Sequence, residues 1–254
     1  MKKLLASLFL LLLVGTAGAK EYDGIWFLGF NTEREPFNNL KVRQAVAHAL
    51  DKEYIARTIV KDDIVPADFI PPGLPGYDPA LRPYKFNPKY ARTLLQRAKY
   101  PPTDPRLKGL TLLHTDGDQT VAIARQIVAD LKEIGLKVEP VMVSYRDQER
   151  WNRELASGQH PLFLLGYKAD SDELFTAEVS AADTDSGQLL SPLFQAGGPA
   201  NFGRFSDPTL NMYFDQLSVI SPALGGARES KLRAIGRLLY KQLPAIVLFY
   251  IEKL

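Results

Sequence analysis

The clearest strand–helix–strand pattern lies at residues 110–143, with the sequence LTLLHTDGDQTVAIARQIVADLKEIGLKVEPVMV. Residues 110–114 predict a strand, and residues 136–143 predict another after Gly135 stops the helix between them. The apolar face of that helix is formed by Val121, Ala124, Ile127, Val128, Leu131 and Ile134. A strand, a helix and a strand in this order are typical of a βαβ unit with parallel strands and a right-handed crossover.

The same alternation continues in both directions from this unit. A helix bearing Trp151 and Leu155 ends at Gly158, and residues 161–167 predict a third strand. Residues 25–30 predict a strand near the beginning of the chain, and the apolar run 244–251 has the length of a buried strand. We therefore expect an α/β fold in which helices flank a mainly parallel sheet.

Polar caps mark further helices outside this alternation. Asp51 is placed to cap a short helix, and the pairs Asn87-Pro88 and Asp207-Pro208 each combine a cap with proline at the first helical position. Apolar spacing also predicts helices near 40–50 and 227–243. Residues 66–83 hold six prolines and predict either a long ordered loop or a linker, whereas the polar stretch between Tyr167 and Asp207 predicts irregular structure.

The first nineteen residues have the three parts of a secretory signal peptide. Lys2 and Lys3 precede an apolar run from Leu4 to Val14, and Ala17-Gly18-Ala19 offers small residues to a signal peptidase. The run is shorter than the roughly 20 apolar residues that cross a bilayer, so we expect cleavage after Ala19 and no stable membrane insertion afterwards. The prediction is an exported, periplasmic protein with one domain at 20–254.

Composition excludes several classes of protein. The chain of 254 residues has 31 Lys and Arg against 29 Asp and Glu, and the excess equals Lys2 and Lys3, so a basic footprint for nucleic acid is not expected. Cysteine is absent, which excludes disulfides and thiolate sites. His48, His114 and His160 are scattered, and no HExxH, GxSxG, phosphate-loop or GxGxxG motif occurs. We expect no enzyme, no metal site and no cofactor.

Several stretches, in order along the chain, resemble the family 5 extracellular solute-binding proteins, the receptors of ABC importers for oligopeptides, dipeptides and nickel. They are FNTEREPFNNLKVRQAVAHALDKEYI at 30–55, PPGLPGYDP at 71–79, YKFNPKYARTLLQRA at 84–98, LLGYKAD at 164–170 and NFGRFSDPTLN at 201–211. The resemblance implies a type II clamshell fold, of which this chain is the second lobe with hinge strands near 25–30 and 245–251. The first lobe is expected to be absent.

The resemblance also implies ligand contacts. LLGYKAD is similar to a family segment in which an aromatic residue lines the pocket and an aspartate binds the α-ammonium group of a peptide, which assigns Tyr167 and Asp170. Tyr167 stands where tryptophan is usual, and Lys168 is close enough in sequence to compete for Asp170. Two alternatives stay open: Asp170 caps the next turn, and Asn201 either contacts the ligand or satisfies loop backbone.

The function implied by the resemblance is solute binding, with an oligopeptide as the expected solute, in an ABC import system. The expected partners are a peptide or similar small solute, and an ABC permease or a separately encoded first lobe. The alternative is a non-transport interaction or vestigial scaffold domain derived from such a receptor.

Overall fold

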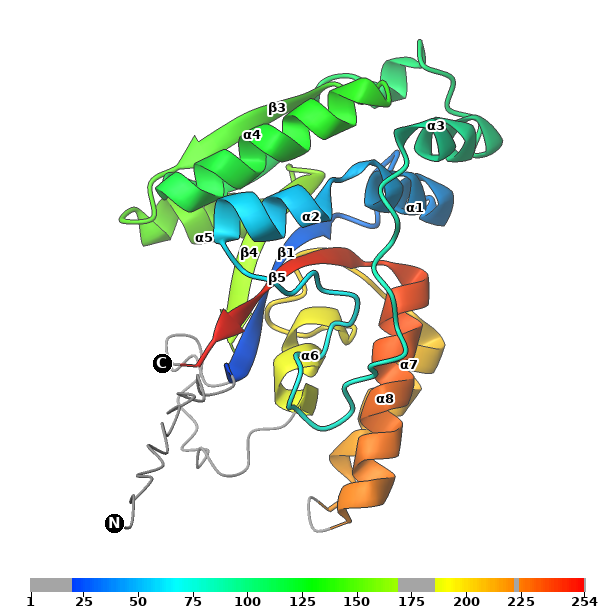
Figure 1. The fold of residues 1–254 in the computed structure, drawn as a ribbon, viewed down its shortest axis with the longest axis vertical. Coiled ribbons are helices and arrows are strands. Elements are labelled where there is room, and N and C mark those ends of the chain that lie inside the picture. The colour runs from blue at the N-terminus through cyan, green and yellow to red at the C-terminus, as the bar shows by residue number, and fades with distance from the viewer. Residues whose placement is uncertain (1–19, 169–185, 222–223, 254) are drawn as a thin grey trace, which may run out of the picture.

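The computed structural model describes residues 20–168, 186–221 and 224–253, and its centre is one five-stranded sheet (Figure 1). The strand order is β3-β2-β4-β1-β5. The strands are β1 (Tyr22–Phe30), β2 (Leu110–Thr115), β3 (Val138–Val143), β4 (Leu162–Lys168) and β5 (Ala245–Glu252). Each corresponds to a predicted strand, because each is an apolar segment bounded by polar or turn residues.

Strand directions in this sheet are mixed. β2 is parallel to β3 and to β4, as the βαβ pattern predicts, whereas β1 is antiparallel to both of its neighbours, β4 and β5. Four of the five strands in the described sheet therefore run the same way, and β1 runs against them. The carboxyl end of β1 consequently lies at the same edge of the sheet as the amino ends of β2 and β4.

The helices follow the predicted capping residues closely. Asp51, Asn87 and Asp207 each accept a hydrogen bond from a first-turn amide through a side-chain oxygen, at 2.9 Å in each case. The helices are α1 (Leu40–Ala49), α2 (Lys52–Tyr54) continued by the π-helix η1 (Ile55–Val60), α3 (Pro88–Arg97), the 3-10 helix η2 (Pro105–Leu107), α4 (Asp118–Glu133), α5 (Gln148–Ser157), α6 (Ser186–Phe194), α7 (Pro208–Ser218) and α8 (Gly225–Gln242).

Helix α6 contradicts the sequence-based expectation of irregular structure between Tyr167 and Asp207. Its sequence, SGQLLSPLF, contains glycine, two serines and Pro192, which all disfavour a helix interior. Four of its apolar side chains are nevertheless buried: Leu189, Leu190, Leu193 and Phe194. The prediction was wrong because tertiary burial of these side chains overrides the weak local propensity.

Two hydrophobic clusters cover the two faces of the sheet. Alternate residues of β4 supply them, with Leu162 and Leu164 on one face and Phe163 and Tyr167 on the other. The first cluster includes side chains from α1, α3 and α4, and the second includes side chains from α5, α6, α7 and α8. Figure 1 shows β5 and β1 passing between α1 on one side and α6 to α8 on the other.

The proline-rich segment before α3 is an ordered loop packed against the second cluster. Phe69 and Ile70 are buried in it, at 2% and 0% exposure. The buried carboxylate of Asp68 accepts hydrogen bonds from the amides of Ile70 at 3.2 Å and Asp78 at 2.9 Å. Arg237 of α8 in turn donates to Asp78 at 2.6 Å. Of the two predicted alternatives, this segment is therefore the ordered loop.

Arg43 joins α1 to the turn that follows α8. Its guanidinium donates to the carbonyl oxygens of Phe37, Gln242 and Leu243 at 2.7, 2.8 and 2.9 Å. Burial lowers the pKa of Arg43 to about 10. These three hydrogen bonds fix the turn after α8 against α1, so the side chain stabilises the fold.

Candidate functional site

Tyr167 lies at the carboxyl end of β4, one residue before the strand ends. It pairs with Ile25 of β1, and its side chain belongs to the second cluster. It is 8% exposed, and burial raises the pKa of its hydroxyl. In open α/β sheets, ligands bind beside the carboxyl ends of strands, so Tyr167 occupies a favourable place for a ligand contact.

A hollow of about 420 Å³ lies next to Tyr167. Its walls come from α6, α7 and the first turn of α8, and they mix apolar and polar side chains. They include Pro192, Phe214, Leu217, Gln188, Ser191, Gln195, Asp215, Ser218 and Arg228. This size and this mixture are typical of small-molecule pockets, in which apolar walls bury the ligand and a few polar groups orient it.

The polar groups of this hollow are held by hydrogen bonds. Ser191 Oγ donates to Gln195 Oε1 at 2.8 Å, and Gln195 Nε2 donates to Asp215 Oδ1 at 3.0 Å. Arg228 donates to the carbonyl oxygens of Leu217 and Ile220 at 2.8 and 2.7 Å. The hollow therefore presents a carboxylate on α7 and a guanidinium on α8, which suits a solute carrying both charges, such as a peptide.

The structure places the other predicted contacts as follows. Asp170 lies outside the described residues. Asn201 donates to the carbonyl oxygens of Gln195 and Phe205, at 2.9 and 2.8 Å, and accepts from the amide of Phe205 at 3.0 Å. Its described contacts are thus with loop backbone. Asn201 lies beside the hollow's Gln195 rather than on the lining of the hollow itself, and its contact with a ligand stays a prediction.

Asp23 is a charged residue at this edge that the sequence analysis missed. Its Oδ2 accepts a hydrogen bond from Lys168 Nζ at 3.0 Å, so Lys168, the predicted competitor for Asp170, is bonded to β1. Its Oδ1 is buried and has no hydrogen-bond partner among residues 20–168, 186–221 and 224–253. The available signal was an aspartate inside an otherwise apolar strand, which is rarely buried without a purpose.

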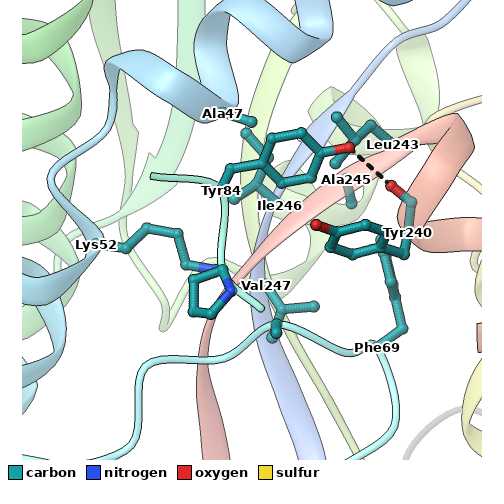
Figure 2. Close-up of a pocket in the computed structure, with 11 residues that line it drawn as sticks. Ala47, Lys52, Phe69, Tyr84, Tyr240, Leu243, Ala245, Ile246 and Val247 are labelled. Carbon is teal, nitrogen blue, oxygen red and sulfur yellow. Dashed lines mark hydrogen bonds between the residues drawn. The ribbon is translucent and has the colours of Figure 1, made fainter. Parts of the chain in front are cut away.

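A second, much smaller cavity lies between the ordered loop, β5 and Ala47 of α1 (Figure 2). It has about 20 Å³ and is lined by Lys52, Tyr84, Tyr240 and apolar residues of β5. Lys52 Nζ donates to the carbonyl of Pro66 at 2.5 Å, and Tyr84 donates to the carbonyl of Tyr240 at 3.2 Å. Burial raises the pKa of Tyr84 to about 12. A cavity of this volume accommodates one water molecule and no solute.

The described residues bring no metal-binding set together. Within 20–168, 186–221 and 224–253, no group of three His, Asp or Glu side chains is arranged to hold a metal ion. His114 bonds the carbonyl of Thr115, and His160 lies between Thr111 and Glu154. Over the same ranges, no helix has both the length and the apolar character needed to cross a membrane.

Comparison with known proteins gives a matching family model, whose description is bacterial extracellular solute-binding proteins, family 5 Middle, and which matches residues 14–181. Heme-binding protein A of Haemophilus influenzae is 29% identical over 87% of this chain and 37% of its own length. Di/tripeptide-binding protein 2 of Pseudomonas aeruginosa is 28% identical over 62% of this chain and 30% of its own length.

Solved structures show the same fold at lower identity. The murein tripeptide binding protein of Escherichia coli matches with a TM-score of 0.76 and 20% identity, over 91% of this chain and 43% of that one. A dipeptide binding protein from Pseudoalteromonas, in complex with Met-Leu, matches with a TM-score of 0.72 and 22% identity, over 90% and 43%. The chain spans less than half the length of these proteins, and its fold is that of one part of a type II periplasmic binding protein.

Proposed function

This chain belongs to the bacterial extracellular solute-binding proteins of family 5, and from that membership we propose that it forms part of the solute cleft of a peptide-binding receptor for an ABC importer. The observation that carries the proposal is the hollow of about 420 Å³ beside Tyr167, at the carboxyl end of β4. Relatives described as binding dipeptides and tripeptides support a peptide as the solute.

The family is one of binding proteins, which supports a function without catalysis. The chemistry of the hollow agrees with this role, because its polar groups are suited to orienting a zwitterion. Asp215 and Arg228 lie on different helices of the lining, and Asp170 comes two residues after the end of β4 in the sequence. In the proposal, Asp170 receives the α-ammonium group of the peptide through a charge-assisted hydrogen bond, while Tyr167 forms an apolar wall.

The proposal includes export. Family members are extracellular, and the predicted signal peptide places cleavage after Ala19, so the mature chain begins at Lys20. A permease and a complementary first lobe are the proposed partners. The alternative function is an interaction or scaffold domain that keeps the fold without binding solute.

Calorimetric titration of the purified mature protein with dipeptides and tripeptides tests the proposal. Asp170→Asn is expected to weaken peptide binding by about tenfold or more, because a charge-assisted bond becomes a neutral one. The melting temperature is expected to stay unchanged. Asp63→Asn, at an exposed position shortly after η1, is the matched control and is expected to keep the original affinity for the peptide.

A chemically modified ligand sharpens this test. An N-acetylated peptide lacks the ammonium group, so it is expected to bind the original protein and Asp170→Asn equally weakly. Equal affinity of the unmodified peptide for both proteins would remove Asp170 from the site. If no peptide binds or raises the melting temperature, the scaffold alternative replaces the proposal.

A further inference from the structure

A second large cavity, of about 380 Å³, lies at the opposite edge of the sheet from Tyr167. It is framed by the loop after β1 and by the loops that enter β2 and β4. Its polar lining consists of Arg34, Glu35, Arg106, Lys108, Thr111, Gln159 and His160. The length of β4, at roughly 3.3 Å per residue, puts about 20 Å between this cavity and the hollow beside Tyr167.

The frame of this cavity is rigid because the loops are bonded to one another. The amide of Asn31 donates to Pro161 O at 3.0 Å, and its side chain donates to Gly158 O at 2.9 Å. Arg34 adds a bond to the carbonyl of Gln159 at 3.1 Å. The loop after β1 and the loop before β4 therefore hold each other, and the cavity exists before any ligand arrives.

Arg106 is oriented by Asp104, by Tyr100 and by the carbonyl oxygen of Lys99, to which its NH2 donates at 3.1 Å. Its Nε and NH2 donate to the two oxygens of Asp104 at 2.9 and 2.7 Å, and its guanidinium lies 4.2 Å from the centre of the Tyr100 ring. Its NH1 is 3.5 Å from an oxygen of Glu35, which is longer than a normal hydrogen bond. Of the three guanidinium nitrogens of Arg106, NH1 is therefore the most weakly bonded, and it is the nitrogen that can donate to a ligand.

The remaining charges leave the cavity positive. Three cations line it, Arg34, Arg106 and Lys108, against the carboxylate of Glu35 on the lining and that of Asp104, which bonds Arg106, so one positive charge is left over. Within the described part of the chain, the Lys108 ammonium has no recorded ion pair or hydrogen bond. Next to it, Gly109 has a φ of +65°, and a β-carbon built there meets no atom within 4 Å, so the backbone is open at this point.

We infer that this cavity is a binding site for a small anion with more than one negative charge, carried by phosphate or carboxylate groups. Arginine forks match both groups in geometry, and lysine supplies a further point charge. The ligand displaces Glu35 from Arg106 NH1 and gains Lys108 and Arg34 as new partners. The site shares no lining residue with the hollow beside Tyr167, so it does not depend on the proposed peptide function.

Isothermal titration of the purified protein with inorganic phosphate and with citrate, at constant ionic strength, tests the inference. We expect saturable binding of at least one anion at one site. Binding of phosphate alone identifies a phosphate ligand, and binding of citrate alone identifies a polycarboxylate. The double variant Arg34→Gln/Lys108→Gln is expected to weaken the bound anion by about tenfold or more. Both side chains are exposed, so the fold is retained.

Two further variants separate a built site from general surface charge. Lys89→Gln/Arg97→Gln removes the same charge from exposed positions on α3 and is expected to change affinity by less than about twofold. Glu35→Gln removes the competing carboxylate and is expected to strengthen binding. The inference is overturned if neither anion binds the original protein with saturation, or if both double variants weaken binding equally.

Discussion

Lys52 is buried in an apolar setting without a carboxylate partner among the described residues. Its side chain is 7% exposed, and its one recorded hydrogen bond goes to the carbonyl of Pro66. Burial lowers the pKa of Lys52 to about 7, because the charged form is poorly solvated there. Lys52 thus attaches the ordered loop to α2, and the free energy of burying its side chain depends on whether the amine is protonated.

This depressed pKa predicts a pH-dependent stability. In the unfolded chain Lys52 keeps its proton up to about pH 10.4. Between pH 7 and 10 the unfolded state therefore binds more protons than the folded state, so the Lys52 contribution raises stability as pH rises, by roughly 3 kcal/mol over this window. Urea unfolding of the original protein and of Lys52→Met at several pH values measures it. Lys52→Met is expected to lack this rise, and parallel pH profiles would contradict the shift.

The proline-rich loop and α6 are two elements that stabilise each other. Phe69 of the loop meets Phe194 of α6 edge to face, with ring centres 5.2 Å apart. Neither element has strong local propensity, since one is rich in proline and the other contains glycine, serine and proline. Their structure is therefore a result of packing on the sheet.

Phe69→Ala tests this dependence. Deleting the buried ring is expected to lower the free energy of unfolding by about 3 kcal/mol and to open the loop to protease. Phe86→Ala is the matched control, because Phe86 lies just after the same loop and is 44% exposed. It is expected to change stability by less than about 0.5 kcal/mol. Equal effects of the two substitutions, measured by urea denaturation, would show that the loop does not depend on its buried ring.

The same elements show what the sequence could and could not predict. Apolar runs and capping residues locate the strands and most helices, because those signals are local. The reversed direction of β1 and the existence of α6 depend on which segments pack together, which no local pattern contains. The site divides in the same way. Tyr167 can be predicted as a site residue from one short sequence segment. Asp215 and Arg228 line the same hollow only because the fold brings α7 and α8 next to it.

At the scale of the whole molecule, a single sheet supports both hydrophobic clusters. β1, β4 and β5 each contribute alternate side chains to both clusters. If the helices of one cluster detach, the strands that also support the other cluster are exposed to water. The two tryptophans report on different layers, since Trp26 packs against the first cluster and Trp151 belongs to the second. We therefore expect the two layers to unfold together.

Two single-tryptophan variants measure this cooperativity. Trp151→Phe leaves Trp26 as the reporter, and Trp26→Phe leaves Trp151. In each variant, the midpoint of urea unfolding from tryptophan fluorescence is expected to coincide with the midpoint from circular dichroism. A fluorescence transition that precedes the loss of secondary structure in one variant would show that its layer separates first.

The antiparallel contact between β1 and β5 has a practical consequence for protein engineering. Tyr22 pairs with Glu252, and the amide of Lys253 donates to Glu21 O at 2.9 Å, so the path of the chain into the sheet and its path out are adjacent. A unit with such neighbouring ends can be spliced into a surface loop of a host protein through two short connectors, or circularly permuted by joining these ends. The described fold can therefore be transplanted into a host protein or circularly permuted.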